Sequence, residues 1–531
     1  MQALPSIQRV DYQFVRSHLL ERHEIALLDV REEDPHAQAH PLFAANFPLS
    51  RLEVDAYAKL PNQGVYIVTI DGGEGLAEIA AQRLIGLGYR QVAVFSGGID
   101  AWAAAGGELF RDVNVPSKSF GEFVEAHCHT PSLSAQEVQA LLERNEDVVV
   151  VDVRRFDEYQ TMSIPKGVSV PGAELVLRVP ELVARPDTRV IVNCAGRTRS
   201  IIGTQSLINA GIPNPVCALR NGTIGWTLAG QKLETGASQR FPQVSAETAR
   251  TALARSRAVA DRAGVKRGSL GDIARWRSDA QRTTYFFDPR TPEEYEHGHL
   301  PGFRSTPGGQ LVQETEMVAP VRGARIVLAD IHGARANMTA SWLAQMAWEV
   351  VVIDGITESD LSEQGPWRSP MPAIPQVAWI TASDLQRQIQ MESDLAIIDF
   401  STHAQYVRGH IPGAWYALRS ELAKAMQAIP SSKHLVLTAS QELLACFAAE
   451  DVRALRPAAI SVLKGGNAAW VAAGLSLQTG PSHLASPPID RYRRPYEGTS
   501  VDPAAMQAYL DWEFGLVEQL GRDGTHHFRV I

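Results

Sequence analysis

One short phrase occurs four times in the chain and limits what it can fold into. Each copy is an apolar run that ends in aspartate, and in three copies an arginine stands two positions later. The copies occupy residues 26–31, 149–154, 285–290 and 397–400. They lie roughly 110 to 140 residues apart, which is typical of whole domains and much longer than a solenoid repeat. The phrase therefore predicts similar domains in tandem.

Two further phrases follow the first in a constant order. A turn with proline and glycine comes next in three copies, at residues 163–167, 298–302 and 409–413, whereas the first copy has residues 44–48 there. A glycine-containing turn followed by tryptophan then closes three copies, at Trp102, Trp226 and Trp470. The third copy ends in Asp354 and Gly355 without the tryptophan. The shared order supports one domain type used four times.

Short β-rich runs alternate with helical patterns between these landmarks. In the second copy, residues 189–193 predict a buried strand, 200–207 the helix after it, and 216–219 the next strand. Fully apolar strands separated by helices indicate a parallel sheet that is covered on both faces. We therefore predict an α/β fold class, in which each of four domains is a parallel sheet flanked by helices.

The joins between the copies give the expected boundaries. Residues 245–263 are rich in alanine and arginine and predict a linker helix, and the prolines of residues 366–375 predict an extended linker. Asp502 followed by Pro503 predicts the start of one amphipathic helix in the C-terminal tail. We expect the tail to pack across the domains or at a subunit contact, and we assign it no chemistry. The expected units are domain 1 (1–118), domain 2 (119–242), domain 3 with its linker helix (243–372), domain 4 (373–484) and the tail (485–531).

Composition excludes several classes of protein. The net charge of −9 and the pI near 6.0 count against a nucleic-acid partner. The first residues lack a basic region followed by an apolar run, and no apolar stretch reaches the roughly 20 residues that span a bilayer, so we expect no membrane segment. Four cysteines without C-x2-C spacing predict neither a disulfide framework nor a zinc site. We expect a reduced, cytoplasmic protein without metal or cofactor, and leave a homo-oligomer open.

Cys194 stands out among the cysteines because it lies between a predicted parallel strand and the helix that follows. Backbone N–H groups converge at such a junction, and with the helix dipole they attract anions and favour a thiolate. Arg197 and Arg199 add positive charge, and Gly196 permits close approach of the backbone. We therefore predict a reactive thiolate with a lowered pKa.

The other cysteines have plainer interpretations. Cys217 lies within an apolar strand pattern and Cys446 on the apolar face of a helix, so both are expected to be core residues. Cys128 stands between His127 and His129, but no fourth partner at recognisable spacing supports a metal site.

Taken together, the phrases resemble the rhodanese family of sulfurtransferases. The Asp-Val-Arg phrase, the His-Ile-Pro-Gly turn, the Cys-Ala-Gly-Arg-Thr-Arg loop and the Gly-Gly…Trp ending occur in the order found in that family. The resemblance covers residues 1 to about 480 as four tandem rhodanese-like domains and is strongest in domain 2. It implies a five-stranded parallel sheet in each domain and a catalytic cysteine that cycles between thiolate and persulfide.

The resemblance also implies residue roles. Cys194 would be the catalytic sulfur carrier, with Asp152 and Arg154 supporting its loop; a direct substrate contact by Arg154 or Arg155 stays open. The implied substrate-binding residues are Ala195, Gly196, Arg197, Thr198, Arg199 and Arg154. At the cysteine position the other domains have Asp71, Asp330 and Ala439, none of which can hold a persulfide. One of the inactive neighbours, domain 1 or domain 3, is expected to wall the active cleft.

The resulting hypothesis is a sulfurtransferase that works by double displacement. Its partners would be thiosulfate or a related anionic donor such as glutathione persulfide, and a thiol or cyanide as acceptor. Alternatives are a sulfane-sulfur sensor or scaffold with weak turnover, and a carrier that delivers sulfur to tRNA or a cofactor, although the acidic charge counts against tRNA. A cysteine phosphatase is disfavoured, because it needs arginine six positions after the cysteine, where this chain has Ser200.

Overall fold

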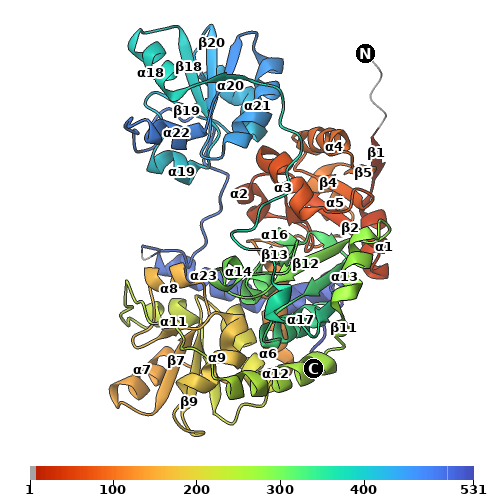
Figure 1. Ribbon diagram of the computed structural model, residues 1–531, viewed down its shortest axis with the longest axis vertical. Helices are drawn as coiled ribbons and strands as arrows, with labels where there is room; N and C mark the ends of the chain where they lie inside the picture. The colour runs from red at the N-terminus through yellow and green to blue at the C-terminus, as the bar shows by residue number, and fades with distance from the viewer. Residues whose placement is uncertain (1–6, 499) are drawn as a thin grey trace.

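The computed structural model describes residues 7–498 and 500–531. Four separate sheets follow one another along the chain, each flanked by helices, and the C-terminal tail returns from domain 4 to run between the other domains (Figure 1). The predicted fold class is therefore confirmed. The domain boundaries themselves stay a proposal, and one helix, α6 (Val115–Cys128), runs across the join expected at residue 118.

All four sheets share one strand order, in which the first strand lies at an edge beside the last long strand. Domain 1 contains β1 (Gln8–Val10), β5 (Gln91–Phe95), β4 (Tyr66–Ile70), β2 (Ile25–Asp29) and β3 (Ala45–Asn46). Domain 2 contains β6 (Ser132–Leu133), β10 (Val216–Leu219), β9 (Arg189–Asn193), β7 (Val148–Asp152) and β8 (Val168–Ser169). Domain 3 contains β11 (Lys266–Gly268), β16 (Glu349–Ile353), β15 (Arg325–Leu328), β12 (Thr284–Asp288) and β13 (Arg304–Ser305). Domain 4 contains β17 (Ala378–Ile380), β21 (Ala459–Leu463), β20 (His434–Thr438), β18 (Leu395–Asp399) and β19 (Trp415–Tyr416).

Helices cover the sheets and fill the joins. Domain 1 carries α1 (Tyr12–Glu21), α2 (Glu33–Gln38), α3 (Leu52–Lys59), α4 (Leu76–Gly86) and α5 (Gly98–Ala104). Domain 2 carries α7 (Ala135–Glu143), α8 (Phe156–Thr161), α9 (Leu175–Leu182), α10 (Thr198–Asn209) and α11 (Gly222–Leu228). Domain 3 carries α12 (Ala246–Arg262), α13 (Leu270–Ser278), α14 (Pro292–His297), α15 (Gly308–Gln313), α16 (Thr315–Val318) and α17 (Ala334–Gln345). Domain 4 carries α18 (Ala382–Gln390), α19 (His403–Arg408), α20 (Leu422–Ala428), α21 (Glu442–Leu455) and α22 (Gly466–Ala472).

Local predictions in domain 2 and at the joins are confirmed. The strand expected at 189–193 is β9, the helix at 200–207 lies within α10, and the strand at 216–219 is β10. The linker helix is α12, whose N-terminus is capped by the side chain of Ser245. The linker 366–375 has neither helix nor strand.

The tail differs from its prediction in one respect. It forms two helices, α23 (Pro503–Phe514) and α24 (Leu516–Asp523), where the sequence predicts one. Asp502 caps the first as expected, and Gly515 separates the two, since glycine is a poor helix former. The expected packing across domains is confirmed, because α23 contacts α11 and α6 while Arg522 pairs with Glu108 of domain 1.

Each recurring phrase makes the same hydrogen bond in the three domains that contain it. The arginine of the Asp-x-Arg phrase donates its Nε to the aspartate Oδ1 over 2.9 Å in the pairs Arg31–Asp29, Arg154–Asp152 and Arg290–Asp288. The three closing tryptophans are buried, and each indole donates to the carbonyl six residues later, at Glu108, Lys232 and Ser476. These bonds explain why the phrases persist in domains that have no thiol at the cysteine position.

The domains are joined by strand pairing and by buried ion pairs. Strand β14 (Val321–Arg322), from the domain 3 part of the chain, extends the sheet of domain 1 by pairing antiparallel with β2. Arg335 of domain 3 binds Glu174 of domain 2 over 3.0 Å, and Arg419 of domain 4 binds Glu53 of domain 1 over 2.6 Å. None of the helices in the described residues is long and apolar enough to cross a membrane.

Candidate active site

Cys194 lies directly after β9, and the loop of residues 194–199, called the Cys194 loop below, leads into the first turn of α10. The cysteine is only 2% exposed. Its thiol donates to the Oγ of Ser200 over 3.4 Å, and that hydroxyl in turn donates to the carbonyl of Arg197 over 2.8 Å. Cys194 is therefore held at the junction of strand and helix that the sequence predicts.

The beginning of α11 fixes the backbone of the loop. Thr223 N–H donates to the carbonyl of Cys194 over 2.9 Å, and Ile224 N–H donates to that of Ala195 over 3.0 Å. Gly222 makes this approach feasible, because its φ is +54° and a Cβ added there would lie 2.3 Å from the Cys194 carbonyl oxygen. A side chain at this position would push α11 away from the loop.

The same contact in other domains confirms the alignment of the cysteine position. A Cβ added to Gly98 would meet the carbonyl oxygen of Asp71 at 2.6 Å, and one added to Gly466 would meet that of Ala439 at 2.3 Å. Asp71 and Ala439 thus occupy the place of Cys194, as the sequence alignment predicts, and neither carries a thiol.

We expect Gly222→Ala to lower sulfur transfer, because the added methyl group displaces the carbonyl of Cys194. The left-handed backbone alone should cost about 1–2 kcal/mol of stability. Gly466→Ala is the matched control, since it creates the same clash in domain 4 without touching Cys194. Thermal unfolding should report similar destabilisation in both variants, while only Gly222→Ala loses activity; equal activity in the two would contradict the assigned role of this contact.

Arg199 supplies positive charge next to the thiol. Its guanidinium is largely buried and forms a two-point ion pair with Glu158, over 2.8 and 2.9 Å. Burial raises the pKa of Glu158, but the charge of Arg199 outweighs it and brings that pKa to about 2. The arginine also lowers the pKa of Cys194 through its charge, so the two side chains interact electrostatically.

In the equivalent loop of domain 3, an arginine binds a carboxylate at the cysteine position. Arg335 stands five positions after Asp330, as Arg199 stands five after Cys194, and it binds the Asp330 carboxylate over 3.0 Å. Arg335 also pairs with Glu294, as Arg199 pairs with Glu158. The equivalent loop of domain 3 therefore carries its own anion at the cysteine position, held by the equivalent arginine.

Arg197 is oriented differently from the expectation. Its guanidinium points to α6, where it binds Glu122 over 2.7 and 2.9 Å and also contacts Glu125, and it donates to Asn221 over 3.1 Å. The ring of Phe514 lies against it, 4.4 Å from the centroid to the guanidinium carbon. Because these carboxylates neutralise its charge, Arg197 ties the loop to α6 and offers no free cation to a donor.

Arg154 has the supporting role that the sequence favours. It is 1% exposed, binds Asp152 through Nε and Nη2 over 2.9 and 2.7 Å, and donates to the carbonyl of Met162 over 2.5 Å. Asp152 also accepts from Asn193, the residue before the nucleophile, over 2.8 Å. The pair therefore holds the end of β9 through Asn193.

The pKa of Cys194 is the main point on which the structure differs from the prediction made from the sequence. Burial raises the pKa of Cys194, and the charge of Glu513 raises it further, while Arg199 and the hydrogen bond with Ser200 lower it. The net direction is upward, where the loop position predicted a lowered value. The reason is that the thiol is buried in the apolar cluster of domain 2, among residues such as Val151 and Val192, which removes water from it.

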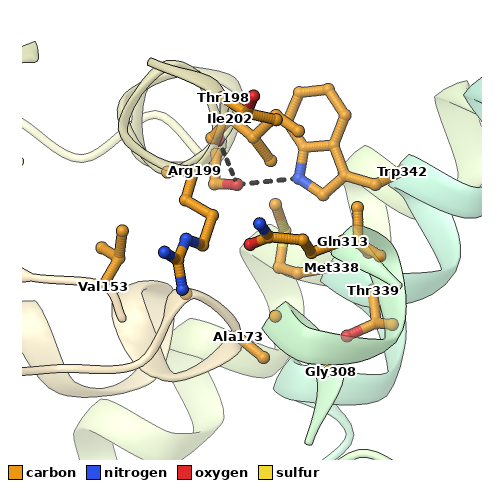
Figure 2. Close-up of a pocket in the computed structure, with 15 residues that line it drawn as sticks. Val153, Ala173, Thr198, Arg199, Ile202, Gly308, Gln313, Met338, Thr339 and Trp342 are labelled. Carbon is orange, nitrogen blue, oxygen red and sulfur yellow. Dashed lines mark hydrogen bonds between the residues drawn. The ribbon is translucent and has the colours of Figure 1, made fainter. Parts of the chain in front are cut away.

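Domain 3 packs against domain 2 beside Arg199. Figure 2 shows Arg199 and Ile202 of domain 2 facing Gln313, Met338 and Trp342 of domain 3. These residues line a cavity with a volume of about 40 Å³. The indole of Trp342 donates to Ser206 of α10 over 2.8 Å across this junction.

A second cavity, of about 230 Å³, opens on the other side of Arg199. It is lined by Arg154 and Arg155 of domain 2, by Gln310 and Gln313 of domain 3, and by Arg491, Arg494 and Tyr496 of the tail. Cys194 itself lines neither cavity.

The tail is the part of the site that sequence analysis missed. A cluster of buried side chains joins Ala195 of the loop and Ile224 of α11 to Tyr496, Met506, Tyr509 and Leu510 of the tail. A Cβ added to Gly196 would lie 3.4 Å from the ring of Tyr509 and 3.5 Å from the carboxylate of Glu513. The apolar spacing of residues 506, 509 and 510 predicts a buried helix face but not its partner.

Comparison with known proteins agrees with this architecture. The sequence pattern of the rhodanese-like domain matches residues 15–105, 134–229 and 381–473, which covers domains 1, 2 and 4. Domain 3 has the same strand order although no match falls within it.

Two relatives differ in how much of the chain they share. The crystal structure of thiosulfate sulfurtransferase from Pseudomonas aeruginosa is 62% identical, covers 99% of this chain and 100% of its own, and superposes with a TM-score of 0.98. An HTH-type transcriptional regulator of Mycobacterium tuberculosis is 34% identical over 99 residues, 18% of this chain, and the chain spans only 43% of that regulator. The chain therefore belongs to the rhodanese family and is a rhodanese-type transferase.

Proposed function

We propose that this protein transfers sulfane sulfur from an anionic donor to a thiophilic acceptor through a persulfide on Cys194. The observation that carries this proposal is the pair of equivalent loops. In domain 3 the arginine binds a carboxylate at the cysteine position, and in domain 2 the equivalent Arg199 stands beside a thiol. A loop that holds an anion in one domain is suited to hold a thiolate or persulfide in the other.

The reaction takes two displacements. The thiolate of Cys194 attacks the outer sulfur of thiosulfate, the S–S bond of the donor breaks, and sulfite leaves with the bonding electron pair. Cys194 then carries a persulfide anion, which Arg199 and the loop N–H groups stabilise. A thiolate or cyanide attacks the outer sulfur, takes it away, and returns the Cys194 thiolate.

Domains 1, 3 and 4 take no direct part in this chemistry. Asp71, Asp330 and Ala439 cannot form a persulfide, so we propose one active site in the chain, at Cys194. The role proposed for domain 3 is to wall the site through Gln313, Met338 and Trp342. All four cysteines are free, which fits a reducing compartment such as the cytoplasm.

Steady-state kinetics with thiosulfate, mercaptopyruvate and glutathione persulfide, each with cyanide or a thiol as acceptor, test the proposal. We expect a higher kcat/KM with thiosulfate or glutathione persulfide than with mercaptopyruvate, because the site offers an arginine and loop N–H groups to an anionic donor. Failure of all three donors to sustain turnover would contradict the proposal.

A sensor of sulfane sulfur is the second candidate, and one observation favours it: Cys194 is only 2% exposed. A sensor would accept one sulfur per chain and release it slowly. The two candidates can be distinguished by mixing protein that already carries the sulfur with excess thiol and measuring the rate of sulfur loss. A transferase should lose its sulfur at least as fast as its steady-state turnover, whereas a sensor should retain it.

A further inference from the structure

Helix α23 covers the Cys194 loop and is fixed there by a buried lysine. The ammonium of Lys118 on α6 binds Asp112 over 2.7 Å and lies 5.1–5.6 Å from the ring centroids of Tyr496, Tyr509 and Trp512. Cation–π contacts of this kind strengthen when water is excluded. The tail is thus an ordered part of the site.

Glu513 is the polar residue that this helix brings to the loop. It is 1% exposed, its Oε1 accepts the hydroxyl proton of Tyr509 over 2.8 Å, and its Oε2 lies against Gly196. Oε2 is buried and has no hydrogen-bond partner within the described residues. A buried polar atom without a partner, facing a loop that binds anions, points to a partner supplied by the ligand.

The surroundings keep Glu513 protonated near neutral pH. Burial and the negative charge of Glu122 raise its pKa, the hydrogen bond from Tyr509 lowers it, and the result is a pKa of about 8. Because Tyr509 already donates to Oε1, the carboxyl proton resides on Oε2. The charged and titratable groups around it are Glu122 and Lys118 of α6, Arg197 and Cys194 of the loop, and Tyr509 of its own helix.

We propose that Glu513, as a neutral carboxylic acid, donates a hydrogen bond from Oε2 to the sulfur-bearing anion held by the Cys194 loop. This inference rests on the proposed function and adds a catalytic residue from the tail to it. The proton stays on Glu513 throughout, so the residue stabilises the bound donor and the persulfide without transferring a proton. When Glu513 ionises, the donor is lost and a negative charge faces the anion instead.

The pH dependence of sulfur loading tests this role. Single-turnover release of sulfite from thiosulfate is the measurement, because thiosulfate keeps its charge between pH 6 and 10. In the wild type, the rate should rise with pH as Cys194 ionises and fall at higher pH as Glu513 loses its proton. The maximum should lie above pH 8, because the pKa of Glu513 is about 8 and that of Cys194 is raised above its ordinary value. Glu513→Gln keeps an N–H donor at every pH, so its rate should rise to a plateau without the alkaline fall.

Two further variants sharpen the test. Glu513→Ala has no donor and should load roughly 10- to 100-fold more slowly at pH 7, the range expected for a hydrogen bond to a charged group. Tyr509→Phe removes the hydrogen bond that lowers the pKa of Glu513, so the alkaline fall should move to higher pH. Glu518→Gln on α24, with a side chain that is 84% exposed, is the matched control and should behave as wild type.

An alkaline fall that persists in Glu513→Gln, or wild-type loading by Glu513→Ala, would overturn the inference.

The rate at which iodoacetamide alkylates Cys194 provides a second test that does not depend on sulfur transfer. Glu513→Gln removes a charge that raises the pKa of Cys194, so the apparent thiol pKa should fall, and an unchanged value would also contradict the inference. If the wild type releases no sulfite, the proposed function itself is contradicted. If the wild type releases sulfite and loads sulfur, the behaviour of the Glu513 variants tests the role of Glu513 alone.

Discussion

Cys194→Ser should transfer sulfur at least about a thousandfold more slowly than the wild type. A serine hydroxyl cannot form a persulfide, and it is almost never ionised near neutral pH. The substitution replaces only the sulfur atom with oxygen, and the hydroxyl can still contact Ser200, so the loop should retain its shape. The measurement is steady-state turnover with thiosulfate and cyanide.

Cys128→Ser is the matched control for this variant. Cys128 is free, only partly buried, and lies at the end of α6, away from the Cys194 loop in sequence. It should keep wild-type turnover. Sulfur transfer by Cys194→Ser at a wild-type rate would end the assignment of Cys194 as the carrier.

Arg199→Ala should lower kcat/KM for thiosulfate by about 10²–10³, the range seen when one group that stabilises an anion is removed. Two causes act together. The thiolate loses the charge that lowers its pKa, and the proposed donor loses a cation that would offset its negative charge. Arg199→Lys keeps the charge but not the two-point contact with Glu158, and an intermediate loss is expected.

The buried partner of Arg199 complicates the single variant. Arg199→Ala removes the closest counter-charge of Glu158 and leaves it only the longer contact with Arg155 over 3.5 Å, which destabilises domain 2 independently of catalysis. The double variant Arg199→Ala with Glu158→Gln removes both charges and should recover thermal stability without recovering kcat/KM. Recovery of kcat/KM in the double variant would show that Arg199 acts through stability alone.

The fold was largely predictable because local patterns repeat. Apolar runs such as β9, the helix after it, and the turn at Gly222 are determined by residues adjacent in sequence, and four copies make the pattern reliable. The position of Cys194 follows from the same local order, as do its counterparts Asp71 and Ala439.

The environment of the site was not predictable, since it depends on residues far apart in sequence. Glu122 and Glu125 neutralise Arg197 from a helix more than 70 positions earlier, and Glu513 reaches the loop from more than 300 positions later. No local pattern encodes these contacts. The same distance bears on the pKa of Cys194, because the charge of Glu513 adds to the effect of burial and raises that pKa.

The most direct test of the account is the mass of the full-length protein and of its cysteine-containing peptides after exposure to thiosulfate. We predict a gain of one sulfur atom per chain, located on Cys194 and released by cyanide, while Cys128, Cys217 and Cys446 stay unmodified. Sulfur on another cysteine, or none on any, would contradict the conclusion that one of four similar domains carries the chemistry.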